Sequence, residues 1–92
     1  MPKPIQHAMT DANIRLECLR PAIHWKEPTG EEIREILRIA GFTSMTAAKA
    51  LGLGIMGDRT VRRWIGGKTV ISYAEWALLC DFAGLGTIWK DT

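Results

Sequence analysis

The sequence has little cysteine, little histidine and little net charge, and each shortage argues against a class of protein. Its 92 residues include two cysteines, Cys18 and Cys80, and two histidines. Because the cysteines lie far apart and belong to no CxxC or Cys/His cluster, we expect free thiols in a reducing cytoplasm, with neither a disulfide framework nor a zinc site. The formal net charge of +2 permits nucleic acid as a partner without arguing for it, so the local distribution of charge must decide.

Long apolar runs are also missing. Residues 74–85 are largely apolar, but they are fewer than a membrane span requires and include Glu75 and Asp81. The first twenty residues have no apolar run and contain Pro2 and Pro4, which argues against a signal peptide. Hydrophobic residues still make up 47% of the sequence, which is enough for a packed core. We therefore expect one compact domain in the cytoplasm, without membrane contact.

The chain divides into a weakly patterned beginning and a strongly patterned remainder. Residues 1–27 are interpreted as an N-terminal extension associated with dimerisation, and residues 28–92 as the main domain, which opens at Pro28. Within the extension, residues 1–10 are expected to be flexible and residues 24–28 to form a linker.

Residues 14–18 leave two structures open. Ile14, Leu16 and Cys18 alternate with charged residues, as in a half-buried strand, whereas Thr10 or Asp11 is suited to cap a short helix. The alternation favours the strand. A lone strand needs a partner, and the same strand of a second subunit would supply one.

Four later segments combine a helix-capping residue, apolar residues at helical spacing and a terminating glycine. They are expected to run from Thr29 to Gly41, from Thr43 or Ser44 to Gly52, from Gly57 or Asp58 to Gly66, and from Ser72 to about Ala83. The first and last begin with capping boxes, formed by Thr29 with Glu32 and by Ser72 with Glu75. The prediction is an all-α fold, a compact bundle of four to five short helices with an N-terminal strand or helix.

The third predicted helix has two chemically different faces. At about 100° per residue, Val61, Trp64 and Ile65 occupy one side of this helix. Three arginines occupy an arc roughly opposite, and we expect no carboxylate on the same helix to pair with them: Arg59, Arg62 and Arg63. Arginine offers paired donors that match guanine or a phosphate. An ordinary solvated helix face is the alternative interpretation.

The second and third helices together suggest a helix-turn-helix. Ala47, Ala48 and Leu51 give the second helix a thin inner side, and Gly52 allows a sharp turn after it. Such a pair places its second helix in the major groove of double-stranded DNA. The turn is about three residues longer than usual, and its Ile55 and Met56 are expected to tuck inward or to touch the sugar edges of DNA.

The stretch TAAKALGL, followed by RTVRRWIGGKTVISYAEWALL, resembles the Cro/phage-repressor class of helix-turn-helix proteins. The pattern TVRRW-x-x-G-K with its following helix is similar to plasmid-borne repressors of the KorC kind, and the likeness covers about residues 28–89. It implies that Thr43 and Ser44 meet a phosphate, and helix N-termini do favour anions. The residues expected to contact DNA are Arg59, Thr60, Arg62, Arg63, Lys68, Thr69, Thr43 and Ser44.

The fourth predicted helix is apolar on nearly every side, so it must be covered on nearly every side. A second subunit would cover part of it, and the predicted dimer interface comprises Trp76, Leu79, Cys80, Leu85, Ile88 and Trp89. The alternative is that the N-terminal segment folds back over this helix within one chain.

These features predict a homodimeric repressor that binds a palindromic operator and blocks a promoter. The alternative is a protein-interaction module, an adaptor or antitoxin-like partner that docks through its tryptophan-rich last helix. The four tryptophans are Trp25, Trp64, Trp76 and Trp89. An enzyme is the weakest reading, because His7 and His24 lie in the poorly patterned region and GLGIMGD follows no strand. No cofactor, metal or small-molecule substrate is expected.

Overall fold

The computed structural model describes residues 13–90, and this part of the chain is helical without any strand. Two short 3₁₀ helices, η1 (Leu16–Leu19) and η2 (Ala22–His24), precede four α-helices. The α-helices are α2 (Gly30–Ala40), α3 (Ser44–Ala50), α4 (Gly57–Ile65) and α5 (Tyr73–Phe82). The predicted all-α bundle is therefore confirmed. The expected flexible lead, the caps Thr10 and Asp11, and His7 lie outside the described residues.

Local capping sets most helix boundaries where the sequence predicts them. The Thr29 and Ser72 hydroxyls each accept a hydrogen bond from the backbone of the glutamate three residues later, and both capping boxes are complete. Thr43 caps α3 in a third box, with Thr46 in place of a glutamate. Gly41 ends α2 with φ of 77°, the left-handed conformation that glycine adopts without strain. These boundaries are fixed by short-range hydrogen bonds and backbone conformation.

The start of α4 differs from the prediction. The helix begins at Gly57 with Met56 at the N-cap, and no side chain caps it, so neither Gly57 nor Asp58 is the cap. The Gly57 amide instead donates to the carbonyl of Gly54, at 3.0 Å, in the preceding turn. The loop before α4 thus starts the helix earlier than a cap at Asp58 would, and Asp58 lies in the first turn of α4.

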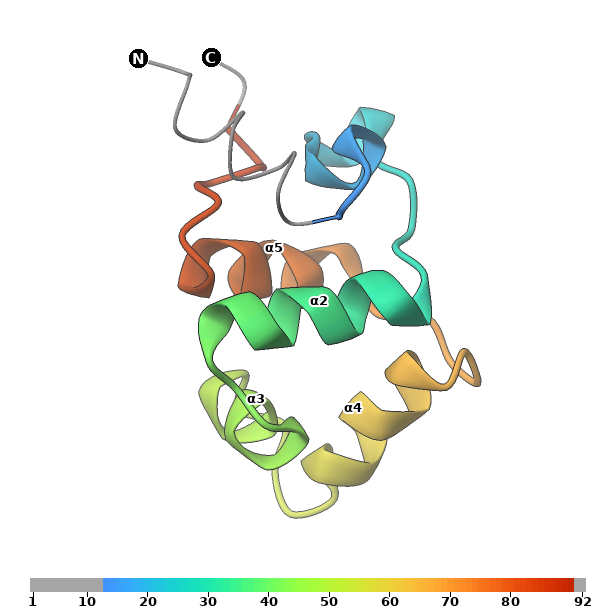
Figure 1. The fold of residues 1–92 in the computed structure, drawn as a ribbon, viewed down its shortest axis with the longest axis vertical. Coiled ribbons are helices and arrows are strands. Elements are labelled where there is room, and N and C mark those ends of the chain that lie inside the picture. The colour runs from blue at the N-terminus through green and yellow to red at the C-terminus, as the bar shows by residue number, and fades with distance from the viewer. Residues whose placement is uncertain (1–12, 91–92) are drawn as a thin grey trace.

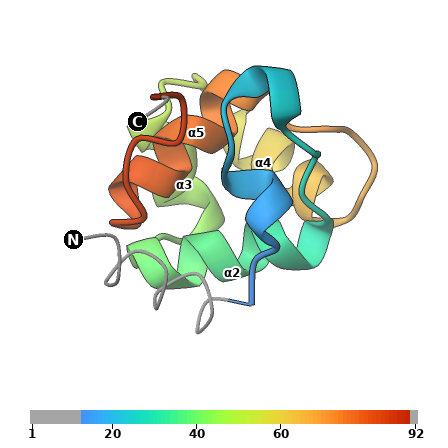
Figure 2. The ribbon, with the colours of Figure 1, turned by 90° about the horizontal axis from the view of Figure 1, so that it is seen from above.

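The helices form three levels along the long axis of the molecule. Figure 1 shows α3 and α4 at one end, α2 and α5 in the middle, and the 3₁₀ helices at the other end. Seen from above, residues 13–28, here called the N-terminal segment, lie over the helices (Figure 2). The largest fully buried side chains come from all three levels: Trp76, Ile33, Ile36, Ile71, Leu79, Val61, Cys18 and Cys80. One core therefore joins the N-terminal segment to α3 and α4.

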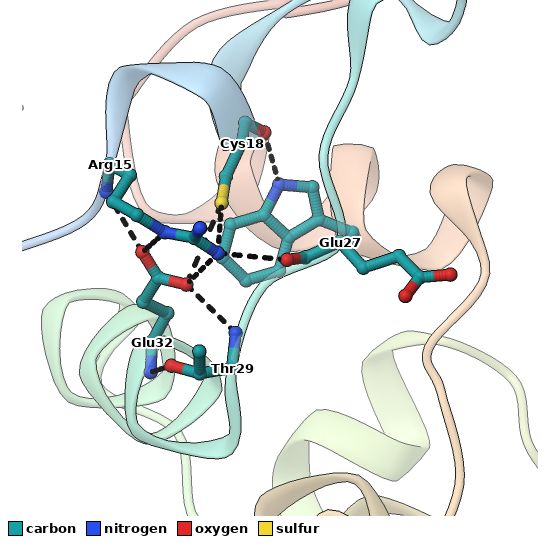
Figure 3. Close-up of polar contacts among 6 residues, drawn as sticks. Arg15, Cys18, Glu27, Thr29 and Glu32 are labelled. Carbon is teal, nitrogen blue, oxygen red and sulfur yellow. Dashed lines mark hydrogen bonds and ion pairs between the residues drawn. The ribbon is translucent and has the colours of Figure 1, made fainter.

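The N-terminal segment is held by a buried carboxylate instead of by strand pairing, so the predicted strand is wrong. Glu32 of α2 accepts hydrogen bonds of 2.9 Å from the backbone amide, Nε and Nη2 of Arg15 (Figure 3). Ile14 and Cys18 are buried, whereas Leu16 between them is 54% exposed. The exposed Leu16 breaks the alternation that favoured a strand, and residues 16–19 form the 3₁₀ helix η1.

The environment of Glu32 shifts two pKa values. Burial raises the pKa of Glu32, but hydrogen bonds from Arg15 and the Thr29 amide lower it more, so that it falls to about 2. Burial, followed by the nearby Glu32 charge, raises the pKa of the Cys18 thiol to about 12. The carboxylate is therefore ionised and the thiol protonated near neutral pH, which suits a structural role for both.

The N-terminal segment also covers α5. The Trp76 indole donates a 2.7 Å hydrogen bond to the carbonyl of Cys18, and the Tyr73 hydroxyl donates to the carbonyl of Arg20 at 3.0 Å. Trp25, in the region expected to be a linker, packs edge-on against Tyr73 with ring centroids 5.2 Å apart. Coverage within one chain, the alternative considered for this helix, therefore accounts for the apolar residues on this side of α5.

This coverage corrects the predicted dimer interface. Five of its six residues are at most 7% exposed in the single chain and are not accessible to a partner: Trp76, Leu79, Cys80, Leu85 and Ile88. The sixth, Trp89, is 42% exposed. The helices within residues 13–90 lack the length and continuous apolar character that spanning a bilayer requires.

Candidate nucleic-acid interface

Close packing fixes α4 against α3. A Cβ atom added at the buried Gly57 would lie 2.6 Å from the Cβ of Leu53 and 2.8 Å from that of Ala48, closer than side chains approach. Only glycine therefore allows the first turn of α4 to reach α3. At the other end of α4, a Cβ on Gly30 would overlap the carbonyl oxygen of Ile65. The two glycines set the position of α4 relative to α3 and α2.

The two faces of α4 are separated as the sequence predicts. Val61 is fully buried and Trp64 is 4% exposed, so both anchor the helix on the core. The three arginines of the helix are exposed on its other side. Arg59 and Arg63, four residues apart, make no ion pair with any residue of the described chain, 13–90. Their guanidinium groups are available to a ligand.

Arg62 differs from these two arginines. Its Nη2 lies 3.2 Å from Oδ2 of Asp58, one helical turn earlier. The expectation that no carboxylate of the helix would pair with the arginines is therefore wrong for Arg62. The cause is the early start of α4, which places Asp58 inside the helix at i, i+4 spacing from Arg62. Both side chains stay partly exposed, so the pair is weak.

The other predicted contact residues lie around α4 in different ways. The Thr60 hydroxyl donates to the carbonyl of Met56, the N-cap residue of α4, at 3.4 Å. Lys68 and Thr69 are exposed in the turn after α4, where both backbone amides donate to the carbonyl of Arg63. Lys68 is thereby fixed close to the end of the helix that carries the arginines.

Thr43 and Ser44 stand at the beginning of α3. The Thr43 hydroxyl accepts from the Thr46 amide at 3.1 Å, so its capping role is realised. Ser44 is half-buried beside a cleft that it shares with Arg62 of α4. The structure thus brings Ser44 and Arg62 to one place, while Thr43 faces solvent next to it.

The turn between α3 and α4 contradicts one expectation. It spans the six residues from Leu51 to Met56. Ile55 is 97% exposed and Met56 is 56% exposed, so neither tucks inward. Gly52 and Gly54 adopt left-handed conformations, with φ of 69° and 81°, and so shape this turn. The side chains of Ile55 and Met56 project from it into solvent.

Two arginines of α2 also belong to this region and were not anticipated. Arg34 and Arg38 line the same cleft as Ser44 and Arg62, which has a volume of about 510 Å³. Arg38 is held by two hydrogen bonds to Glu35, of 2.9 and 2.8 Å. The i, i+4 spacing of the two arginines indicates from sequence that they share the polar side of α2. Only tertiary packing brings that side next to α4.

Charge is unevenly distributed along the chain. Residues 34–69, which extend from α2 through the turn after α4, contain seven of the twelve Lys and Arg residues. The same segment contains two of the ten Asp and Glu residues, Glu35 and Asp58. The net charge of the whole protein is therefore small although the part that includes α3 and α4 is strongly basic.

The fold and this basic part define a small all-helical domain that presents an arginine-bearing helix to solvent. No protein-family model matches the chain, and no solved structure matches it. Two curated proteins from Escherichia coli, each named transcriptional repressor protein KorC, are similar to it. One is 68% identical over 81 residues, covering 88% of this chain and 95% of the relative. The other is 65% identical over 82 residues, covering 89% and 96%.

Identity at this level over nearly the full length of both relatives establishes the family. The chain belongs to the KorC family of transcriptional repressors.

Proposed function

We propose that this protein is a sequence-specific repressor that inserts α4 into the major groove of double-stranded DNA. The observation that carries the proposal is the two-sided construction of α4. Val61 and Trp64 anchor one side in the core, while Arg59 and Arg63 project from the other without a carboxylate partner among residues 13–90. A helix firmly seated on its domain can present guanidinium groups to base edges in a defined geometry.

The pairing of α3 with α4 supports a helix-turn-helix. The two helices are consecutive and make the most extensive helix–helix contact in the described chain. Their six-residue connection is longer than the three or four residues typical of the motif. The extra length exposes Ile55 and Met56 beside the start of α4, where they are placed to contact DNA sugars.

The residues around α4 supply contacts to the DNA backbone. Lys68 and Thr69 lie in the turn after α4, and Thr43 and Ser44 lie at the start of α3. Hydroxyl, ammonium and amide groups at such positions fix the register of a protein on the duplex without reading its sequence. Thr60 supplies a further backbone contact from the flank of α4, although its hydroxyl also donates to the carbonyl of Met56.

Repression follows from occupancy. A domain of this size covers a short stretch of duplex, so two copies on a palindromic operator bind a promoter more tightly and more selectively than one. The exposed apolar residues Leu78, Phe82 and Trp89 support such a dimer, because they remain uncovered on α5 and the segment after it. An operator that overlaps a promoter is then closed to polymerase.

The proposal is tested by selecting duplexes from a random pool and titrating the winning sequence by fluorescence anisotropy. We expect a palindromic site that is bound at least about a thousandfold more tightly than random duplex at physiological salt. Sedimentation velocity should show two protein chains on that site, and Leu78→Lys should reduce this to one. Equal affinity for selected and random DNA would refute sequence-specific binding.

A further inference from the structure

Three arginines from two different helices converge on the cleft between α2, the start of α3 and α4. We propose that this cleft binds one phosphate of the DNA backbone through Arg34, Arg38 and Arg62, so that Arg62 contacts the backbone while Arg59 and Arg63 face the bases. This inference rests on the proposed function, because it presupposes DNA as the partner. It extends the contact surface from α4 to α2, a helix outside the helix-turn-helix pair.

The position of Arg62 on α4 separates it from the other two arginines. At about 100° per residue, Arg62 is displaced by about 60° from Arg59, towards the side of Asp58 and Ile65. Arg63 is displaced from Arg59 in the opposite sense. Arg62 therefore borders the cleft that α2 shares, whereas Arg59 lies at the centre of the exposed face.

The carboxylates next to the cleft do not neutralise it. Glu35 binds Nε and Nη2 of Arg38, and Asp58 binds Nη2 of Arg62, while Arg34 makes no ion pair within residues 13–90. A guanidinium has five N–H donors, so donors remain on both paired arginines. Such exposed pairs contribute little free energy, so a phosphate can displace them or bind beside them.

The lining of the cleft favours an anion. Besides the arginines and Ser44, the cleft is lined by the apolar residues Leu37, Phe42 and Ile65. These apolar residues offer an anion no competing negative charge, so the arginines supply the charge of the lining. Three positive side chains around one space also repel one another, and an anion between them relieves this repulsion. The planar guanidinium matches two phosphate oxygens at once, which makes arginine well suited to this role.

The test compares Arg34→Ala, Arg38→Ala and Arg62→Ala with the full-length wild type in anisotropy titrations at several salt concentrations. Each variant is titrated with the selected operator and with random duplex of equal length. Arg20→Ala is the matched control, because Arg20 is equally charged and exposed but lies in the N-terminal segment, away from the cleft. Thermal melts confirm that each variant is folded.

We expect each cleft variant to weaken binding to operator and random duplex by the same factor, about five- to tenfold, with a salt slope lower by about 1. The control should change neither quantity. Wild-type-like affinity in Arg34→Ala and Arg38→Ala would overturn the proposal, and so would a changed base preference in Arg62→Ala. If the wild-type protein binds no DNA, the proposed function fails as well. If the wild type binds DNA and the cleft variants bind it equally well, only the phosphate site in the cleft is refuted.

Discussion

Replacing Glu32 with glutamine tests how the N-terminal segment is attached. Glutamine keeps the length of the side chain and an oxygen that can accept from Thr29, but it removes the charge that three N–H groups of Arg15 share. A pKa lowered from 4.5 to about 2 corresponds to about 3 kcal/mol of folding free energy. Because the Arg15 side chain is 48% exposed, solvent screening reduces this, and we expect a loss of about 2 kcal/mol.

The pH dependence gives this prediction its sign. The pKa of Glu32 is lower in the folded protein than in the unfolded chain, so the ionised carboxylate stabilises the fold above about pH 5 and loses this effect as pH falls towards about 2. The difference between wild type and Glu32→Gln should therefore be largest near neutral pH and shrink with acidification.

Urea unfolding followed by tryptophan fluorescence measures this difference at a series of pH values. Glu35→Gln is the control. Glu35 is on the same helix and is also paired with an arginine, but that arginine is 67% exposed, so the expected loss of unfolding free energy is close to zero. A loss in Glu32→Gln as small as in the control, or one that does not change with pH, would refute the reasoning.

Three further predictions concern packing and thiol chemistry. Gly57→Ala should destabilise the fold by about 1–2 kcal/mol in urea unfolding and weaken operator binding, because its Cβ would force α3 and α4 apart. Gly66→Ala is the control: its Cβ has ordinary contacts, so the free energy of unfolding should not change. Trp76→Phe should cost about 2–3 kcal/mol in the same assay, since a buried carbonyl loses its indole donor; an unchanged midpoint would contradict this role. Cys18 and Cys80 are fully buried with raised pKa values, so both should react with a thiol reagent only on unfolding, and rapid labelling of the native protein would show the burial to be wrong.

Features that depend on neighbours in sequence could be predicted. The Thr29 and Ser72 capping boxes and the left-handed Gly41 involve residues within one turn of each other, so their physics is present in the sequence itself. The two faces of α4 likewise follow from helical spacing alone.

Features that depend on tertiary packing could not be predicted. The alternation in residues 14–18 fits both a strand and a turn of helix. Hydrogen bonds between Arg15 and Glu32, which is distant in the sequence, decide between these two structures. The same applies to α5, whose apolar residues predict burial without saying what buries them. Arg34 and Arg38 join the candidate interface only because α2 packs beside α4.

The central claim is that the exposed face of α4 reads DNA sequence through Arg59 and Arg63. The most direct measurement is the ratio of dissociation constants for random and selected duplex, compared between wild type and the double variant Arg59→Ala/Arg63→Ala. Since a good bidentate contact to a base contributes about 1–3 kcal/mol of discrimination, we predict that the ratio falls at least about tenfold while the protein stays folded. A ratio equal to that of wild type would contradict the claim.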